Sequence, residues 1–239
     1  MQLKKITSSL GAGRRSYDDA CGAAHALDLI GERWALLVIR ELMLGPKRFS
    51  DLRADLPGIS ANVLTQRLEG LEAAGVLIRR KLPPPASSQV YELTPWGYES
   101  EPIFQTLGRW ATRSPLHDPT LPLSAVSLFL SFRTMIDPAR AHGINARIGF
   151  RIGAETYLLR LAKGRVEVTR GPIDRADLIF TGSPPAIAGA VYGGQPLDAL
   201  AASGALSIEG DRKLAEKFVT LFPLPPKIET AAGTPQASK

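Results

Sequence analysis

The sequence predicts two domains, a mainly α N-terminal domain followed by an α+β C-terminal domain. Three observations support this fold class. Apolar residues recur at helical spacing over most of the first 113 residues, whereas the later part holds a helix and then alternating, strand-like segments. Between them, residues 114–122 contain three prolines, which disfavour both helix and central strand. We therefore expect domains at residues 17–113 and 123–226, joined by a linker at 114–122.

The composition is that of a globular protein and excludes several classes. The 239 residues are 44% apolar and 22% charged, and the net charge is +6. No run of about 18 apolar residues exists, and residues 1–15 lack the apolar block of a secretory signal, so we expect a cytoplasmic protein without membrane contact. The single cysteine, Cys21, excludes an internal disulfide. The positive charge favours an anionic partner such as nucleic acid.

Two helices open the N-terminal domain. Asp18 or Asp19 can cap a helix that runs to about Ile30. A second helix, about residues 33–44, is apolar on most sides and so belongs in the middle of a core. Gly45-Pro46 ends it.

A third and a fourth helix have the spacing of a helix-turn-helix unit. Ser50 caps a short helix, residues 57–59 form a tight connection, and Ser60 caps the next helix, which ends at Gly75. The second helix of the unit carries an apolar stripe of Leu64, Leu68 and Leu71. Its opposite face presents Asn62, Thr65, Gln66 and Glu69.

This polar face predicts contact with DNA. Asn and Gln side chains pair two-pronged with adenine in the major groove, and the positive N-terminus of a helix favours phosphate. We therefore expect Asn62, Thr65, Gln66 and Arg67 to face or flank the bases. The alternative is an ordinary solvated helix face.

A basic hairpin follows the second helix of the unit. Residues 76–81 and 89–93 alternate as strands around a loop that contains three consecutive prolines. In this position the hairpin is a wing that can lie along phosphates, although basic strand ends are also commonly solvated. The candidate phosphate ligands are Lys47, Arg48, Arg53, Arg79, Arg80 and Lys81.

A further helix begins with Thr94 as its cap and Pro95 as its first residue. It carries an apolar stripe of Ile103, Leu107 and Trp110. Such a stripe is either core or the seam of a homodimer, and two copies would match the twofold symmetry of a duplex operator.

The segments CGAAHALDLIGERW (21–34) and LLVIRELMLGPKRFSDLRADLPGISANVLTQRLEGLEAAGVL (36–77) resemble the HxlR family of bacterial winged helix-turn-helix transcription regulators. The resemblance covers about residues 17–113. It implies a homodimer that binds double-stranded operator DNA, with residues 60–74 as the recognition helix and 81–89 as the wing. The sequence departs from the family at Gly22, where proline is often found, and in the three prolines of the wing.

Cys21 is a candidate redox sensor. It lies near a helix N-terminus and four residues before His25, and both features lower a thiol pKa, whereas Asp18 and Asp19 act in the opposite direction. Some proteins of the HxlR family sense oxidants or electrophiles with a cysteine at this position. The alternative is an inert cysteine packed against the partner subunit. One Cys and one His are too few for a zinc site, so we expect no metal.

The C-terminal domain has the pattern of a sheet with helices on one side. The expected helices begin near Ser124, Ser183, Leu197 and Asp211. The expected strands are residues 146–152, 157–161, 164–168, 178–180 and 205–208.

The segments ADLIFTGSPPAIAGAVYGG (176–194) and GALSIEGDRKLAEKFVTLF (204–222) resemble the sterol-carrier-protein type-two fold, over about residues 122–224. The resemblance implies a tunnel for lipid-like or other apolar small molecules between sheet and helices. Close packing without a cavity is the alternative. The candidate pocket residues are Ile148, Phe150, Ile152, Phe180, Ile187, Val191 and Phe218.

Nothing in the sequence predicts an enzyme. The three histidines are scattered, and zinc-protease, serine-hydrolase, P-loop and Rossmann motifs are absent. We expect no cofactor and no catalysis, but a dimeric DNA-binding regulator, a repressor, whose second domain senses an apolar small molecule. The alternative function is a lipid or small-molecule carrier in which the N-terminal domain only dimerises.

Overall fold

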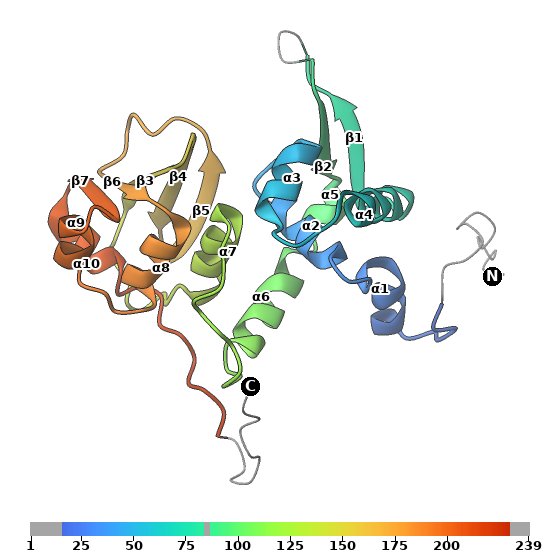
Figure 1. Cartoon of the computed structure of the whole chain (residues 1–239). Coiled ribbons are helices and arrows are strands. Elements are labelled where there is room, and N and C mark those ends of the chain that lie inside the picture. Colours follow the sequence, from blue (N-terminus) through green and yellow to red (C-terminus); the bar gives the residue numbers. More distant parts are fainter. Residues whose placement is uncertain (1–15, 84–86, 230–239) are drawn as a thin grey trace. The chain divides into compact units, whose positions relative to one another are not determined.

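The computed structural model describes residues 16–83 and 87–229, in two compact units divided between Ser100 and Glu101 (Figure 1). This division precedes the predicted linker, so the helix that starts at Glu101 groups with the second unit. Residues 1–15, which were considered for a secretory signal, and residues 84–86 of the proline-rich loop lie outside the described residues. In the described part, no helix is long and apolar enough to cross a membrane.

The first unit contains the predicted helices, several with shifted ends. They are α1 (Gly22–Ile30), α2 (Ala35–Leu42), α3 (Phe49–Asp55), α4 (Ala61–Ala73) and α5 (Pro95–Tyr98). The predicted cap at Asp18 or Asp19 is wrong: Cys21 is the N-cap, and the Asp19 carboxylate instead accepts a hydrogen bond from the Cys21 amide at 2.8 Å. The second helix starts only at Ala35 because Trp34 has a left-handed backbone, with φ of 78°.

The helix-turn-helix unit is built around α3 and α4. Arg48, not Ser50, is the N-cap of α3, and its amide donates to the Asp51 carboxylate at 3.3 Å. The predicted cap of α4 is confirmed, because Ser60 Oγ accepts from the Val63 amide at 3.3 Å. The predicted leucine stripe is buried with the apolar residues of α2 and α3. These core residues are Val38, Ile39, Leu42, Leu52, Leu64, Leu68 and Leu71.

Strands β1 (Leu77–Lys81) and β2 (Gln89–Leu93) form the predicted antiparallel hairpin, with Leu77 opposite Leu93 and Lys81 opposite Gln89. Thr94 caps α5 as predicted, since its Oγ1 accepts from the Gly97 amide at 3.0 Å. The single helix expected from Thr94 onward is two helices, α5 and α6 (Glu101–Ala111), because the first one ends at Tyr98.

The second unit is an α+β layer, as expected. Its helices are α6, α7 (Ala125–Met135), α8 (Pro184–Val191), α9 (Leu197–Ala202) and α10 (Arg212–Phe218). Its strands are β3 (Ala146–Ile152), β4 (Glu155–Ala162), β5 (Arg165–Arg170), β6 (Leu178–Gly182) and β7 (Leu206–Gly210). They form one sheet in the order β5-β4-β3-β6-β7, in which only the β3–β6 pair is parallel (Figure 1).

An aromatic cluster forms the core of the second unit. The rings of Phe150 of β3, Phe180 of β6 and Phe218 of α10 contact one another, with centroids 5.6 to 6.0 Å apart. Phe132 of α7 stacks on Phe222 at 4.6 Å. Aromatic pairs at these separations stabilise a core beyond the area that they bury. The cluster therefore ties the sheet to the helices on its inner face.

Candidate nucleic-acid interface

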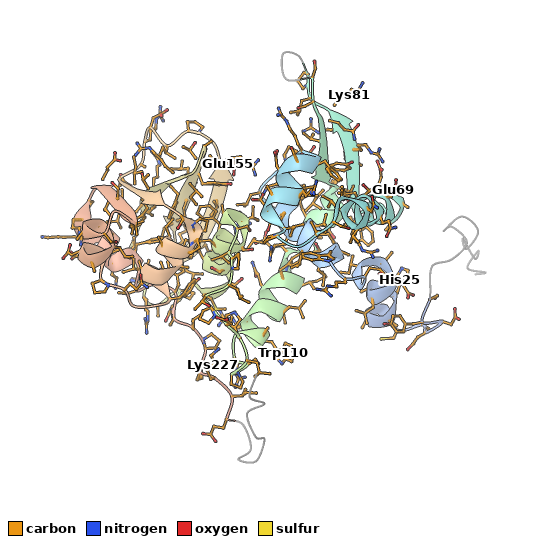
Figure 2. All side chains as sticks on the ribbon, viewed as in Figure 1. His25, Glu69, Lys81, Trp110, Glu155 and Lys227 are labelled. Carbon is orange, nitrogen blue, oxygen red and sulfur yellow. The ribbon has the colours of Figure 1, made fainter. Side chains whose placement is uncertain are left out.

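Helix α4 presents a polar face to solvent. Asn62, Thr65 and Gln66 are exposed, and the opposite side of the helix is fixed in the core by its leucines. Side chains on a helix buried along one stripe point in a fixed direction, so these three groups share one outward face. Glu69, seven residues after Asn62, is exposed on the same face and is labelled in Figure 2. The arrangement offers amide and hydroxyl groups, the chemistry that reads base edges.

Arg67 is on α4 but does not belong to that face. Its Nε donates to the carbonyl of Arg33 at 2.9 Å, and its Nη2 lies 3.1 Å from Glu32 Oε2. The guanidinium is thus bound to the turn between α1 and α2, and its contact with the bases stays a prediction. The sequence carried no local signal of this pairing, since the partners lie 34 and 35 residues earlier.

Lys47 is buried among carboxylates, unlike the other predicted phosphate ligands, and its contact with phosphate stays a prediction. The residue is 4% exposed, and its ammonium lies 3.2 Å from Glu41 Oε2 and also binds the Asp55 carboxylate. Its backbone pairs with Tyr91 of the wing through two hydrogen bonds, of 3.0 and 2.8 Å. To bind a phosphate, this lysine would have to leave a fully buried glutamate.

The remaining predicted phosphate ligands are exposed. Arg79 pairs with Glu72 at 2.8 Å and Arg80 pairs with Glu92, and these hydrogen bonds raise the pKa of both guanidinium groups. To bind Arg79 and Arg80, DNA phosphates would have to replace the carboxylates of Glu72 and Glu92. The other three, Arg48, Arg53 and Lys81, are exposed, and Figure 2 shows Lys81 at the wing end of β1. Arg48 Nε also donates to Ser88 Oγ at 3.1 Å, which links the start of α3 to the wing.

Cys21 is exposed at the N-terminus of α1. Hydrogen bonds from the backbone of Ala24 and Ala23 lower the pKa of its thiol. The helix N-terminus is thus the cause of the shift, as predicted, and His25, labelled on α1 in Figure 2, is not among its causes.

Two helices have apolar stripes that the described structure leaves uncovered. Helix α1 contains no buried residue, and Leu27 is half exposed. Helix α6 likewise contains none, and its stripe of Ile103, Leu107 and Trp110 faces solvent, with Trp110 73% exposed. Exposed apolar stripes of this length mark sites of association.

The predicted ligand-pocket residues lie in the core of the second unit. Five are buried, namely Ile148, Phe150, Phe180, Ile187 and Phe218, while Ile152 and Val191 are half-buried. The aromatic rings among these residues contact one another and leave no tunnel open between them. The tunnel for an apolar ligand therefore stays a prediction. A polar pair lies in the same unit, where the hydroxyls of Ser131 and Tyr192 are 2.7 Å apart and burial raises the pKa of Tyr192.

A pocket that sequence reasoning missed lies in the first unit. It measures about 150 Å³ and is open to one side. Its lining residues come from α1, α2, α4 and the turn after α1, and they are Leu29, Glu32, Ala35, Gln66, Arg67, Gly70 and Leu71. Among the described residues, no group of three or more His, Cys, Asp or Glu side chains is placed to hold a metal ion.

Comparison with known proteins identifies both parts of the chain. Residues 29–117 match the HxlR-like helix-turn-helix family, and residues 130–223 match the SCP-2 sterol transfer family. The HTH-type transcriptional regulator YvaP of Bacillus subtilis is 38% identical over 87 residues, which are 36% of this chain and 81% of that protein. The chain belongs to the HxlR family.

A second relative of this HxlR protein is YodB, an HTH-type transcriptional regulator of the same organism, with 38% identity over 36% of this chain and 77% of YodB. The solved structure of reduced YodB is 34% identical and covers 42% of this chain and all of that one, with a TM-score of 0.37. The protein is thus a DNA-binding transcription regulator of winged helix-turn-helix type that carries an α+β domain of the SCP-2 family.

Proposed function

We propose that this HxlR protein is a dimeric repressor that acts in the cytoplasm and reads its operator with α4. The exposed, uncharged polar side chains of Asn62, Thr65 and Gln66 carry the proposal, because such side chains distinguish bases in the major groove. Arg48, Arg53 and Lys81, together with the paired Arg79 and Arg80, would bind the phosphates on either side of the groove.

The apolar stripes of α1 and α6 support dimerisation. Each would be covered by a second copy of the chain, which removes Leu27, Leu107 and Trp110 from water. A twofold dimer places two recognition helices about 34 Å apart, the spacing of adjacent half-sites.

The SCP-2 domain supports a sensing role for an apolar small molecule. The aromatic core would have to open to admit a ligand, and the ligand regulates DNA binding only if its affinity differs between the two protein states. We propose no catalytic role for this domain, because the sequence lacks a convergent acid, base and nucleophile.

Selection of duplexes from a random library by the full chain tests this function. We expect enrichment of an inverted repeat with half-sites about 10 bp apart. Long-chain fatty acids and sterols added to the enriched duplex should then change its affinity for the protein. Failure to enrich any sequence would contradict operator recognition and favour a carrier protein whose first domain only dimerises, and enrichment of a single half-site would contradict the dimer.

The exposed Cys21 thiol supports a second input, oxidation. Because backbone hydrogen bonds lower its pKa, a larger fraction is thiolate at neutral pH than in an unstructured cysteine, and the thiolate is the reactive form. We expect the alkylation rate with iodoacetamide to rise at lower pH in the folded protein than in the same protein in urea. Mass spectrometry of the single cysteine measures both profiles.

The matched variant Cys21→Ser should remain unlabelled and should bind the enriched duplex after treatment with diamide as it does before. Identical pH profiles for folded and unfolded protein would contradict the activated thiol. A diamide effect that persists in Cys21→Ser would contradict its role as sensor.

A further inference from the structure

We propose that Arg67 is a positioning residue, which sets the orientation of the recognition helix by binding the turn Gly31–Trp34 and does not contact DNA. The proposal rests on operator reading by α4. Arg67 is one residue away from Gln66, whose amide is part of the base-reading face, yet its own side chain is only 21% exposed.

Two bonds from one guanidinium hold α4 to this turn. Nε donates to the carbonyl of Arg33 at 2.9 Å, and Nη2 lies 3.1 Å from the Glu32 carboxylate. The planar guanidinium fixes the directions of both donors, which a lysine ammonium on a flexible stem cannot do. Binding to two neighbouring groups therefore restrains both the position and the rotation of α4 relative to the turn.

The turn is itself a constrained structure. Trp34 has a φ of 78°, a conformation that bulky side chains adopt only where their surroundings enforce it. A Cβ at Gly31 would lie 2.5 Å from the carbonyl oxygen of Leu27, so only glycine fits there. The turn is closed by the Ala35 amide, which donates to the Glu32 carbonyl at 2.9 Å. Arg67 thus binds a rigid anchor rather than a loose loop.

The same turn also reaches the start of the recognition helix. The ring of Trp34 is the nearest group to the position of a Cβ at Gly58, 3.9 Å away, in the connection between α3 and α4. The Gly31–Trp34 segment is therefore adjacent to the connection that precedes α4 and is bonded to Arg67 in the middle of α4. The segment Gly31–Trp34 is the GERW part of the sequence that resembles the HxlR family. None of its residues is among those that we place at the DNA, so DNA contact does not explain this segment.

Side-chain packing between α4 and the turn is incomplete beside the two bonds of Arg67. The placement of α4 on this side therefore depends more on these bonds. The 150 Å³ pocket lies next to them, and Gln66 and Gly70 of α4 form part of its wall. The leucine stripe holds α4 on the core side, whereas on this side the Arg67 guanidinium bonds α4 to the turn, and Arg67 and Glu32 both line the pocket. Because an ion pair this exposed contributes little to stability, we expect its loss to change the placement of Gln66 more than the folding of the unit.

The test compares Arg67→Gln, Glu32→Gln and the double variant in the full chain. The probes are the duplex enriched from a random library by the wild type and a scrambled duplex of equal length. We expect Arg67→Gln to lose about tenfold in affinity for the enriched duplex, the value of one well-formed base contact, and less than twofold for the scrambled one. Glu32→Gln should weaken enriched-duplex binding in the same way, and the double variant should be no weaker than Arg67→Gln.

Two matched variants separate positioning from charge. Arg53→Gln removes an exposed arginine from α3 and should weaken both duplexes equally, while Glu69→Gln removes an exposed acid from α4 and should not reproduce the loss seen in Glu32→Gln. The dependence of log affinity on log salt should be unchanged in Arg67→Gln. A direct phosphate contact would instead reduce this slope by about one.

The proposal is overturned if Arg67→Gln weakens both duplexes alike, if its salt slope falls, or if Glu32→Gln binds as tightly as the wild type or tighter. The last result would mean that a released guanidinium contacts DNA. Thermal unfolding checks that the variants are folded, and if Arg67→Gln is not, Glu32→Gln, which retains the arginine, decides. Absence of any enriched duplex with the wild type would refute operator reading itself, whereas the variant results concern Arg67 alone.

Discussion

Replacing Asn62 and Gln66 by alanine together is expected to reduce affinity for the operator by roughly 100-fold, while affinity for a scrambled duplex stays within about twofold. Each side chain can make one two-pronged base contact, and each such contact is worth roughly 1–3 kcal/mol of discrimination. Both residues are exposed and neither contributes to the leucine stripe, so the fold should be unaffected. Electrophoretic mobility shift with the two duplexes measures the ratio.

Glu69→Ala is the matched control on the same helix, because it removes an exposed polar side chain that we do not place at a base edge. It should keep the preference for the enriched duplex. If the double variant binds both duplexes as the wild type does, α4 does not read the bases. Equal weakening on both duplexes would assign Asn62 and Gln66 to the phosphates.

The elements that the sequence predicted well are those with a strong local signal. Ser60 and Thr94 cap their helices through the expected hydroxyl, and the wing strand at residues 89–93 has the expected ends. A side-chain cap and a strict alternation depend only on residues a few positions apart, so a single sequence contains them.

The helix ends that were misplaced depend on backbone conformation rather than on residue type. Trp34 continues the apolar pattern of α2, and nothing in its side chain indicates its left-handed φ. Likewise, Asp18 or Asp19 was expected to cap α1, but the Asp19 carboxylate bonds to the Cys21 amide one residue before the helix starts. In the second case the side chain binds a different backbone group from the one expected.

The site residues divide along the same line. The exposure of Asn62, Thr65 and Gln66 could be predicted because helical periodicity separates them from the leucines. The carboxylate partners of Lys47 and Arg67 could not, because a basic residue has the same appearance in a sequence whether it faces water or a carboxylate brought near by folding. Their partners follow from tertiary structure, which charge counting along the chain does not contain.

Lys47→Met is expected to destabilise the first unit by about 3 kcal/mol, because it leaves the Glu41 carboxylate in the core without this cation. Arg40 still pairs with Glu41 at 2.8 Å, which places the cost at the lower end for a broken buried pair. Hydrogen exchange of the α2 peptides, followed by mass spectrometry, measures the opening free energy of this unit separately from the second one. Glu41→Gln added to Lys47→Met should restore part of the loss, since the remaining group is then neutral.

Lys81→Met is the matched control, an exposed lysine of the wing that should leave exchange unchanged and reduce the salt slope of DNA binding by about one. The opposite pattern for Lys47, unchanged exchange in α2 with a smaller salt slope, would return it to the phosphate ligands and contradict its burial beside Glu41. Unfolding stability and salt dependence thus assign Lys47 to the core and Lys81 to the phosphates. Lys47 cannot have both roles, since its ammonium cannot neutralise Glu41 and a phosphate at once.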